Sequence, residues 1–350
     1  MEYRIKHINN DFHVKEAYME PEFCDKDKAT YTLAELTKDN INTFDVIKHI
    51  ALNIKVASDD VSYSGLKDED GITTQLVAIQ GIYDQSVFDH ISNQPGSKLK
   101  LIVKGYSKCP LQIGKLHGNI FQITLRDIDR KYFEKLTQIN NKIIKIPTVN
   151  YYDTQRFGIP DSLHNTHTIG KNILVEDWES ALVEYLKSGN SQTEKDKLLK
   201  CSRTETTKTA FFKILDKRKL SFLLNAYMSY NWNEKVKELL LGQQGDCNLY
   251  EYDNDVMSLL FLNDSGNAQT SLNNYCTYSY YTVDDNRTFK EVKKQRQIML
   301  YNNISVSNLD DDDLFEGKIK IQLSFYLQSG SYATMVVKQV MENQRHDLYL

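Results

Sequence analysis

A strict alternation of apolar and polar residues near the end of the chain constrains the fold more than any other feature. Every second residue from position 319 to 327 is apolar and its neighbours are polar, the apolar positions being Ile319, Ile321, Leu323, Phe325 and Leu327. Side chains of a strand point alternately to its two faces, so this period predicts a long strand with one buried face. Residues 119–125 show the same pattern and predict a second such strand.

Length and composition favour a globular protein large enough for two domains. The chain has 350 residues, of which 41% are hydrophobic and 26% charged, values typical of soluble proteins. No apolar run approaches the roughly 18 residues of a membrane-spanning helix. The first residues lack the apolar centre of a signal peptide. We therefore expect a cytoplasmic protein.

Cysteine and histidine spacings give no support for a metal site. The five cysteines are scattered and lack CxxC spacing, which favours reduced thiols over a disulfide framework or a zinc site. His164 and His167 are three residues apart in a polar stretch. Two exposed loop histidines are a better interpretation of this pair than metal ligands. The sequence thus predicts neither a metal nor a cofactor.

Basic residues are concentrated in two stretches, although the net charge is −4. Residues 98–131 carry eight lysines and arginines against two acids, and residues 187–219 carry ten against four. Acids gather instead at positions 310–313. Screening limits distant charges to roughly 10 Å, so local basic surface on an acidic protein can bind a phosphate backbone. Charge alone also fits ordinary solvated helix faces.

The coarse organisation changes twice along the chain. The first 155 residues or so are mixed α/β in character, and Thr43 is a suitable N-cap for a helix carrying Val46, Ile47 and Ile50. Residues 160–305 are more helical, polar and irregular, and the sequence does not predict the structure of 243–282. A strand and a helix end the chain, the helix carrying apolar residues at Ala333, Val336, Val337, Val340 and Met341.

A polar pair follows a short apolar run that ends at a glycine. Val61 and Tyr63 precede Gly65, and Lys67 and Asp68 come directly after it. A strand that stops at a glycine presents its next side chains at a sheet edge, where catalytic residues often lie. Taken alone, a solvated turn or a helix cap explains these residues equally well.

Six ordered motifs resemble the TruD family of tRNA pseudouridine synthases over most of the chain. The resemblance rests on Lys6 with residues 11–16, on Asn42-Thr43, on Gly65-Leu66-Lys67-Asp68 with Thr73-Thr74-Gln75 behind it, on Gly118-Asn119-Ile120-Phe121, on Gln155-Arg156-Phe157-Gly158, and on residues 325–334. Departures occur at Gly71, at Tyr152-Asp153 where Phe-Gly is common, at Cys109-Pro110, and at Lys338-Gln339 where Arg-Glu is usual. They put substrate contacts and packing in doubt more than chemistry.

The resemblance implies an α+β fold with a pseudouridine-synthase-like catalytic domain built on a mixed, mainly antiparallel sheet. It further implies an inserted α+β domain and a V-shaped molecule. The catalytic domain would comprise residues 1–158 and 306–350, and the inserted TRUD domain residues 159–305. The implied reaction is isomerisation of uridine to pseudouridine in tRNA, at position 13 of the D-arm, by a monomer without cofactor.

Residue roles follow from the same resemblance. Asp68 would be the essential carboxylate, acting as nucleophile or base, and Lys6 would keep it charged. Asn119 would orient the carboxylate and Phe121 would stack on the base, although Phe121 also suits a strand core. Glu16, Lys67 and Gly118 would contribute substrate contacts, with surface solvation an alternative for Glu16 and a tight turn for Gly118.

A polar–aromatic junction supplies further substrate-binding candidates. Gln155, Arg156 and Phe157 lie at the expected domain boundary. Arg156 would contact a phosphate or fix the hinge, and a structural salt bridge is an equal alternative.

Two rival functions remain open from the sequence. One is the same chemistry on another RNA site. The other is a non-catalytic RNA-binding or RNA-folding protein on this scaffold, which has no need for a carboxylate such as Asp68 facing an anionic ligand.

Overall fold

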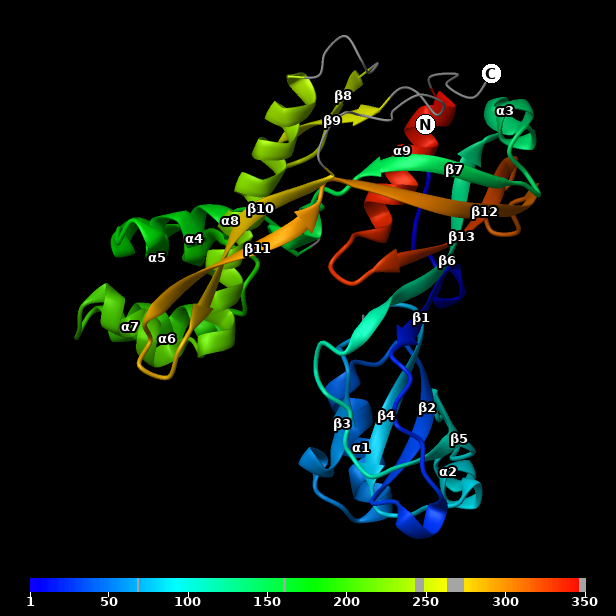
Figure 1. The fold of residues 1–350 in the computed structure, drawn as a ribbon. Helices are drawn as coiled ribbons and strands as arrows, with labels where there is room; N and C mark the ends of the chain where they lie inside the picture. The colour runs from blue at the N-terminus through cyan, green and yellow to red at the C-terminus, as the bar shows by residue number, and fades with distance from the viewer. Residues whose placement is uncertain (68, 160–161, 243–248, 263–273, 346–350) are drawn as a thin grey trace. The chain divides into compact units, whose positions relative to one another are not determined.

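The computed structural model describes residues 1–67, 69–159, 162–242, 249–262 and 274–345. The chain divides into two compact units (Figure 1). Unit 1 consists of Met1–Ile146 and Asn302–Ala333, and unit 2 of Pro147–Tyr301 and Thr334–Leu350. The functional domain boundaries expected at 158/159 and 305/306 stay a prediction.

A nine-stranded sheet organises unit 1. Its order is β5-β2-β4-β1-β6-β13-β12-β7, with β3 paired to β4. The strands are β1 (Phe12–Tyr18), β2 (Tyr31–Asp39), β3 (Val61–Tyr63), β4 (Ile72–Gln80), β5 (Leu99–Ser107), β6 (Leu116–Asp129), β7 (Ile143–Val149), β12 (Met299–Asp311) and β13 (Lys318–Gln328). β1 and β4 run parallel, whereas β6 pairs antiparallel with both β1 and β13. The predicted mixed, mainly antiparallel sheet is confirmed.

The two alternating segments are adjacent strands, β6 and β13, in the middle of this sheet. Leu323 lies opposite Ile123, and Phe325 lies opposite Phe121. The apolar residues of β13 are buried at every second position. Both predicted strands are therefore confirmed, and their apolar faces lie on the same side of the sheet.

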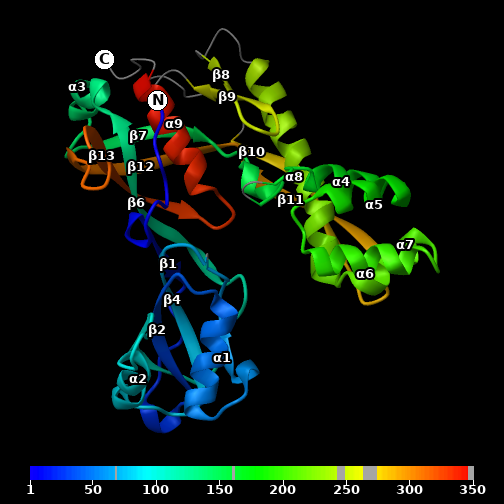
Figure 2. The ribbon, with the colours of Figure 1, turned by 180° about the vertical axis from the view of Figure 1, so that it is seen from behind.

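Helices α1 (Thr43–Ile54) and α2 (Gln85–Ser92) cover one face of the strands β2 to β5 (Figure 2). The predicted face of α1 is buried, with Ile50 fully inaccessible. The expected N-cap is wrong by one residue: Asn42 caps the helix by accepting from the Asp45 N–H at 2.9 Å. Thr43 is instead the first residue of the helix, and its hydroxyl binds the backbone of Lys67. Short helical segments complete unit 1: η1 (Asn9–Asp11), η2 (Lys26–Lys28), η3 (Ser58–Asp60), η4 (Arg130–Tyr132) and α3 (Phe133–Thr137).

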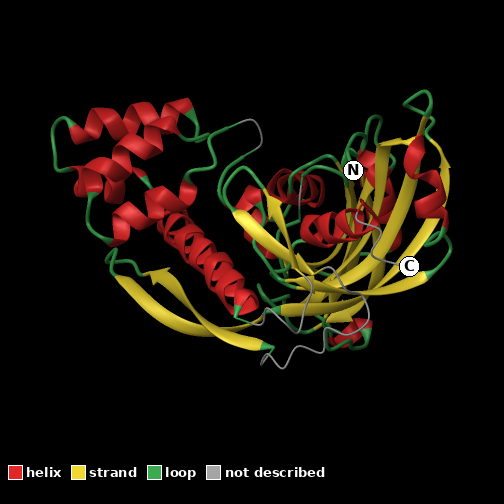
Figure 3. Cartoon of the chain, turned by 90° about the horizontal axis from the view of Figure 1, so that it is seen from above, coloured by secondary structure: helices red, strands yellow, loops and turns green. Residues whose placement is uncertain are grey.

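Unit 2 is mainly helical. Its elements are η5 (Thr154–Arg156), α4 (Thr166–Leu174), α5 (Trp178–Lys187), α6 (Gln192–Ser202), α7 (Thr207–Ile214), α8 (Lys217–Leu241), β8 (Leu249–Asp253), β9 (Ser258–Leu262), β10 (Tyr275–Val283), β11 (Phe289–Gln297) and α9 (Ala333–Arg345). Trp178, Tyr185 and Phe211 lie in one core of this unit. The β10–β11 hairpin runs along the long helix α8 (Figure 3).

The structure defines part of the stretch 243–282 and changes the expectation for the two histidines. The stretch 243–282 contributes β8, β9 and most of β10, and residues 243–248 and 263–273 lie outside the described residues. His167 is not an exposed loop residue: it lies in the first turn of α4 and stacks on Tyr230 at 4.6 Å between ring centroids. His164 approaches Asp255 instead, at 3.9 Å. The two histidines thus have different partners.

Candidate active site

A buried ion pair joins the Gly65–Lys67 loop to the sheet. Lys67 Nζ lies 2.6 Å from Glu16 Oε2, and the two side chains are 5% and 0% exposed. Glu16 is on β1, and Lys67 follows β3. Burial raises the pKa of the Glu16 carboxyl above its ordinary value, and the Lys67 ammonium opposes that increase. The pair fixes the Lys67 side chain rather than presenting it to solvent.

The backbone of Lys67 is fixed as firmly as its side chain. Its N–H donates to the Thr43 hydroxyl at 3.3 Å, and its carbonyl accepts from the same hydroxyl. The buried Lys38 ammonium also reaches that carbonyl, at 3.5 Å, and the Ile41 carbonyl at 2.7 Å. Gln75 Nε2 donates to the carbonyl of Gly65 at 3.1 Å. Two groups, the Thr43 hydroxyl and the Lys38 ammonium, consequently hold the backbone of the residue preceding Asp68, and Gln75 holds Gly65.

Asp68 itself lies outside the described residues. Its role as the essential carboxylate, and its pairing with Lys6, therefore stay predictions. Sequence reasoning noted Gln75 only as part of a motif and missed Thr43 and Lys38 as supports. Their signal was weak, because a threonine at a helix start and a lysine in a strand have many ordinary explanations.

Polar side chains gather on the sheet face beside this ion pair. Glu16 is directly opposite Asn119 in the β1–β6 register. The β1–β4 register, in which Val14 pairs with Thr73, places Gln75 on the same face as Glu16. Among the described residues, four buried oxygens on this face have no hydrogen-bond donor: Glu16 Oε1, Thr73 Oγ1, Gln75 Oε1 and Asn119 Oδ1. Such acceptors need donors, and here they line up along three neighbouring strands.

An aromatic cluster adjoins the polar group. Phe121 is 8% exposed and stacks on Phe325 at 5.7 Å, while Phe12 meets it edge-to-face at 6.1 Å. Lys6 places its ammonium over the Phe12 ring, 4.1 Å from the centroid. Lys6, Phe12 and Phe121 thus form one continuous set of contacts. Phe325 and Phe12 thus cover much of the Phe121 ring, and its role as a stacking partner for a base stays a prediction.

Gly118 is explained by strand packing. A Cβ at this position would lie 2.0 Å from the carbonyl oxygen of Leu327 and 2.9 Å from the Cα of Gln328. Only glycine allows β6 and β13 to approach this closely. The expected tight turn is absent here, because Gly118 lies within β6. A direct substrate contact by Gly118 stays a prediction.

The three candidates in unit 2 have different environments. Phe157 is fully buried and meets the rings of His167 and Tyr230 edge-on, at 5.4 and 6.3 Å. A substrate contact would require its side chain to leave this core. Gln155 is exposed in η5. Arg156 donates from Nε to the Ser229 hydroxyl at 3.1 Å and makes no ion pair with any described residue.

No group of three or more histidine, cysteine, aspartate or glutamate side chains in the described part of the chain is arranged to hold a metal ion. Cys24, Cys109, Cys201 and Cys276 are free thiols. In the same residues, no helix combines the length and apolar character that crossing a membrane requires.

The family model described as tRNA pseudouridine synthase D (TruD) matches residues 1–210. The chain belongs to the TruD family. This match includes β1, the Gly65–Lys67 loop and β6, which carry the site described above. The predicted enzyme class, an isomerase of the tRNA pseudouridine synthase type, follows from family membership, and tRNA follows as its class of substrate.

Individual TruD relatives resemble the chain over most of its length. The probable tRNA pseudouridine synthase D 1 of Methanococcus maripaludis is 28% identical, with 97% of this chain and 99% of the relative covered. The human pseudouridylate synthase 7 homolog is 34% identical over 184 residues, 53% of this chain and 27% of that protein. The crystal structure of the putative TruD protein of Methanosarcina mazei matches with a TM-score of 0.68 at 18% identity, covering 97% and 93% of the two chains. That match shows the fold.

In both basic stretches of this TruD protein, about half of the charges are paired with carboxylates. Arg126 is buried and bonded to Asp11 at 2.7 Å, Asp312 at 2.9 Å and Asp313 at 2.7 Å. It therefore cannot contact a phosphate, contrary to the expectation for the whole stretch 98–131. The acidic run at 310–313 supplies most of this pairing. The lysines that stay exposed, without a carboxylate partner among the described residues, are Lys98, Lys100, Lys108 and Lys115.

Half of the ten basic residues in the second stretch are paired with carboxylates of the described chain. Lys208 is paired with Glu176 and Lys217 with Asp285. Lys213 and Glu205 form another pair. The basic residues of 187–219 that have no carboxylate within ion-pair distance in the described chain include Lys197, Lys200, Arg203 and Arg218. Fewer basic side chains are therefore available to a phosphate backbone than the number of lysines and arginines in the two stretches indicates.

Proposed function

We propose that this protein isomerises a uridine of tRNA to pseudouridine at position 13 of the D-arm, using Asp68 as the essential carboxylate and no cofactor. The observation that carries the proposal is the TruD match across residues 1–210, together with the anchored loop that ends at Lys67. A cytoplasmic location and a monomeric state are parts of the same proposal.

The reaction requires three things of the protein: an ionised carboxylate, a means of holding the detached base, and the exclusion of water. The glycosidic bond between N1 and C1′ breaks, the uracil turns, and C1′ rejoins the base at C5. The C5 proton leaves and N1 gains one, so the product is an isomer of the substrate. An ionised carboxylate close to ribose and base is needed whether it attacks carbon or takes a proton. The detached base must also be held and kept from water.

Residues of unit 1 would meet these requirements. Lys6 would hold Asp68 in its charged form, since a carboxylate in a partly buried site otherwise gains a proton. Asn119 would donate its amide to that carboxylate, which leaves its buried Oδ1 to accept from another donor. Phe121 would stack on the uracil, a contact that contributes roughly 1–3 kcal/mol. Glu16 and Lys67 would act as positioning residues.

Gln155, Arg156 and Phe157 complete the proposed set. Gln155 and Arg156 would contact the RNA backbone, while Phe157 would hold η5 in place through its ring contacts. The target base must leave its stack to reach Asp68, at a cost of a few kcal/mol.

The first test maps pseudouridine in total tRNA transcripts incubated with purified protein. Wild type should modify one position, and Asp68→Ala should modify none. The matched control is Asp70→Ala, which removes an exposed carboxylate two residues further along and should retain activity. A transcript with cytidine at position 13 should stay unmodified. Modification elsewhere would replace the D-arm assignment, and binding without modification by wild type would indicate a non-catalytic RNA-binding protein.

A further inference from the structure

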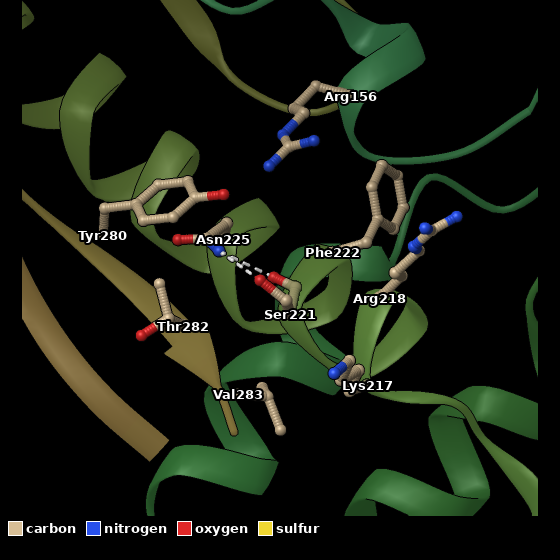
Figure 4. Close-up of a pocket in the computed structure, with 9 residues that line it drawn as sticks. All are labelled: Arg156, Lys217, Arg218, Ser221, Phe222, Asn225, Tyr280, Thr282 and Val283. Carbon is tan, nitrogen blue, oxygen red and sulfur yellow. Dashed lines mark hydrogen bonds between the residues drawn. The ribbon is translucent and has the colours of Figure 1, made fainter. Parts of the chain in front are cut away.

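A pocket of about 400 Å³ lies in unit 2, apart from the residues assigned above to the chemistry. Its walls come from the first turns of α8, from β10 and from Arg156 of η5. The lining includes Arg156, Lys217, Arg218, Phe222 and Tyr280, and no acidic side chain takes part in it. Figure 4 shows the Arg156 guanidinium reaching toward the space between Tyr280 and Phe222.

The cations of this pocket are only partly neutralised. Lys217 is paired with Asp285 at 2.5 Å, whereas Arg218 is exposed and has no ion-pair partner in the described part of the chain. Arg156 uses one N–H on Ser229 and lies 4.8 Å from the Phe222 ring centroid. Its two terminal nitrogens are therefore available to an anion, and a planar guanidinium matches phosphate geometry.

Arg218 occupies a position in α8 at which a cation does not stabilise the helix. It lies in the first turn of α8 between Lys217 and Lys219, and that turn holds no acidic residue. The N-terminal end of a helix carries partial positive charge and disfavours cations. Lys217 and Lys219 are compensated by Asp285 and by Glu194, at 2.5 and 3.9 Å. The N-cap Asp216 accepts from the Lys219 N–H at 2.7 Å, but Arg218 itself has no ion-pair partner in the described part of the chain, which favours a ligand-binding explanation for its presence.

An aromatic surface completes the pocket. Phe222 is 41% exposed, unusual for a phenylalanine on a helix that is otherwise well packed. Tyr280 lies across the pocket from it (Figure 4) and carries Lys294 over its ring at 3.6 Å. An exposed aromatic ring beside arginines is the combination that binds an unpaired nucleotide through stacking and phosphate contacts.

The walls are held together before any ligand binds. Asn225 is 3% exposed and bridges α8 to β10: its Oδ1 accepts from the Tyr281 N–H at 2.8 Å, and its Nδ2 donates to the Tyr281 carbonyl at 2.7 Å. The Ser221 hydroxyl donates to the same carbonyl at 3.0 Å, which is the third bond between α8 and β10. A preformed pocket loses less free energy on binding than one that must be ordered by its ligand.

We propose that this pocket binds one unpaired nucleotide of the substrate RNA, with Phe222 stacking on its base and Arg156 and Arg218 binding its phosphate. The proposal rests on the proposed function and deepens it by naming a second point of RNA contact. A double helix does not fit this chemistry, because its bases are stacked on one another and unavailable to Phe222.

The test uses full-length protein and a single-stranded RNA hexamer that contains a fluorescent adenine analogue whose emission falls on stacking. Wild type should quench the probe, and Phe222→Leu should bind it roughly 5- to 100-fold more weakly with little quenching. Phe133→Leu, an equally conservative change at an exposed phenylalanine of unit 1, should behave as wild type. Arg218→Gln should weaken binding without lowering the melting temperature.

Enzymatic readouts separate this proposal from the proposed function. With tRNA, Phe222→Leu should raise KM and leave kcat at saturating RNA within about twofold. Quenching by wild type without any pseudouridine formation would overturn the proposed function and support the pocket. Pseudouridine formation with equal quenching and equal KM for both proteins would overturn the pocket alone. Displacement of the hexamer by poly-glutamate as efficiently as by unlabelled RNA would also overturn it, in favour of a general anion site.

Discussion

Lys67 and Glu16 form an ion pair of 2.6 Å in which neither side chain is more than 5% exposed. The pair connects Lys67, the residue before Asp68, to Glu16 of β1, which lies opposite Asn119 of β6. Two charges in such a place cost desolvation free energy that their attraction roughly offsets. The ion pair therefore positions the two side chains rather than adding net stability to the protein.

Removing one partner should be far more costly than removing both. Lys67→Met leaves the Glu16 carboxylate buried without a cation and should lower the free energy of unfolding by about 3–5 kcal/mol. The double variant Glu16→Gln/Lys67→Met should lose clearly less. Denaturant unfolding measures both.

The stability lost in Lys67→Met should also depend on pH. Since an unpaired Glu16 must bind a proton to stay buried, the loss in free energy of unfolding should shrink as the pH falls toward 5. A loss that does not change with pH would contradict the ion-pair account. The exposed pair Lys28–Asp25 provides the control, with an effect below about 1 kcal/mol.

Two neighbouring residues at the start of α1 should separate stability from catalysis. Asn42 caps the helix, whereas Thr43 holds the Lys67 backbone. Asn42→Ala should cost about 0.5–2 kcal/mol of stability and leave kcat unchanged. Thr43→Val should lower kcat by about 10- to 100-fold, since the loop that carries Asp68 loses its anchor.

Thr43→Ser retains the hydroxyl and should restore most of that activity. Single-turnover pseudouridine formation at saturating tRNA, beside melting temperatures, measures both effects. Equal kcat for Thr43→Val and Asn42→Ala would show that the anchor at Lys67 has no catalytic role.

Local patterns predicted the strands and helices well, because the spacing of apolar residues along the sequence indicates which face of a strand or helix is buried. Leu323 and Phe325 had to point to one face, and they do. Long-range pairings were not predictable. Arg126 looked like a phosphate ligand until the fold brought Asp11, Asp312 and Asp313 to it from distant parts of the chain. The pairing of Lys67 with Glu16, and the support from Lys38, depended in the same way on which strands become neighbours. Asp68 was named from its motif, and its role stays a prediction.

His167 should make the stability depend on pH. Its burial beside Tyr230 and Phe157 lowers the imidazole pKa from its ordinary value near 6.5 to about 4. The unfolded chain therefore binds a proton between pH 6.5 and 4 that the folded chain does not. The stability from neutral His167 is complete above pH 6.5 and is lost as the pH falls toward 4.

His167→Phe keeps the stacking and removes this titration. Between pH 7 and 4.5, its free energy of unfolding should fall by roughly 2 kcal/mol less than that of wild type. Denaturant titrations across this range measure the difference. Parallel curves for the two proteins would exclude a depressed pKa at His167.

Two departures from the TruD pattern should compensate one another. Asp153 and Lys338 are ion-paired at 2.6 Å, with side chains 4% and 17% exposed. Asp153→Asn keeps the cap on η5, where the side chain accepts from the Thr154 N–H, but removes the charge. A double-mutant cycle with Lys338→Met should give a coupling free energy of about 0.5–3 kcal/mol. Additive effects would show that the two residues are not energetically coupled.

The lysines that stay exposed in the stretch 98–131 should determine how tRNA binding depends on salt. Lys108 and Lys115 are exposed and have no carboxylate partner among the described residues. If each contacts a phosphate, Lys108→Gln and Lys115→Gln should each flatten the slope of log affinity against log salt by about 1. The rate with bound substrate should not change.

Arg126→Gln is the informative contrast in the same stretch. It should lower stability by about 3–5 kcal/mol, because three carboxylates lose their shared cation. At temperatures where this variant remains folded, its salt slope should equal that of wild type. Filter binding from about 50 to 200 mM salt measures all three variants. Unchanged slopes for Lys108→Gln and Lys115→Gln would place the tRNA backbone on other residues.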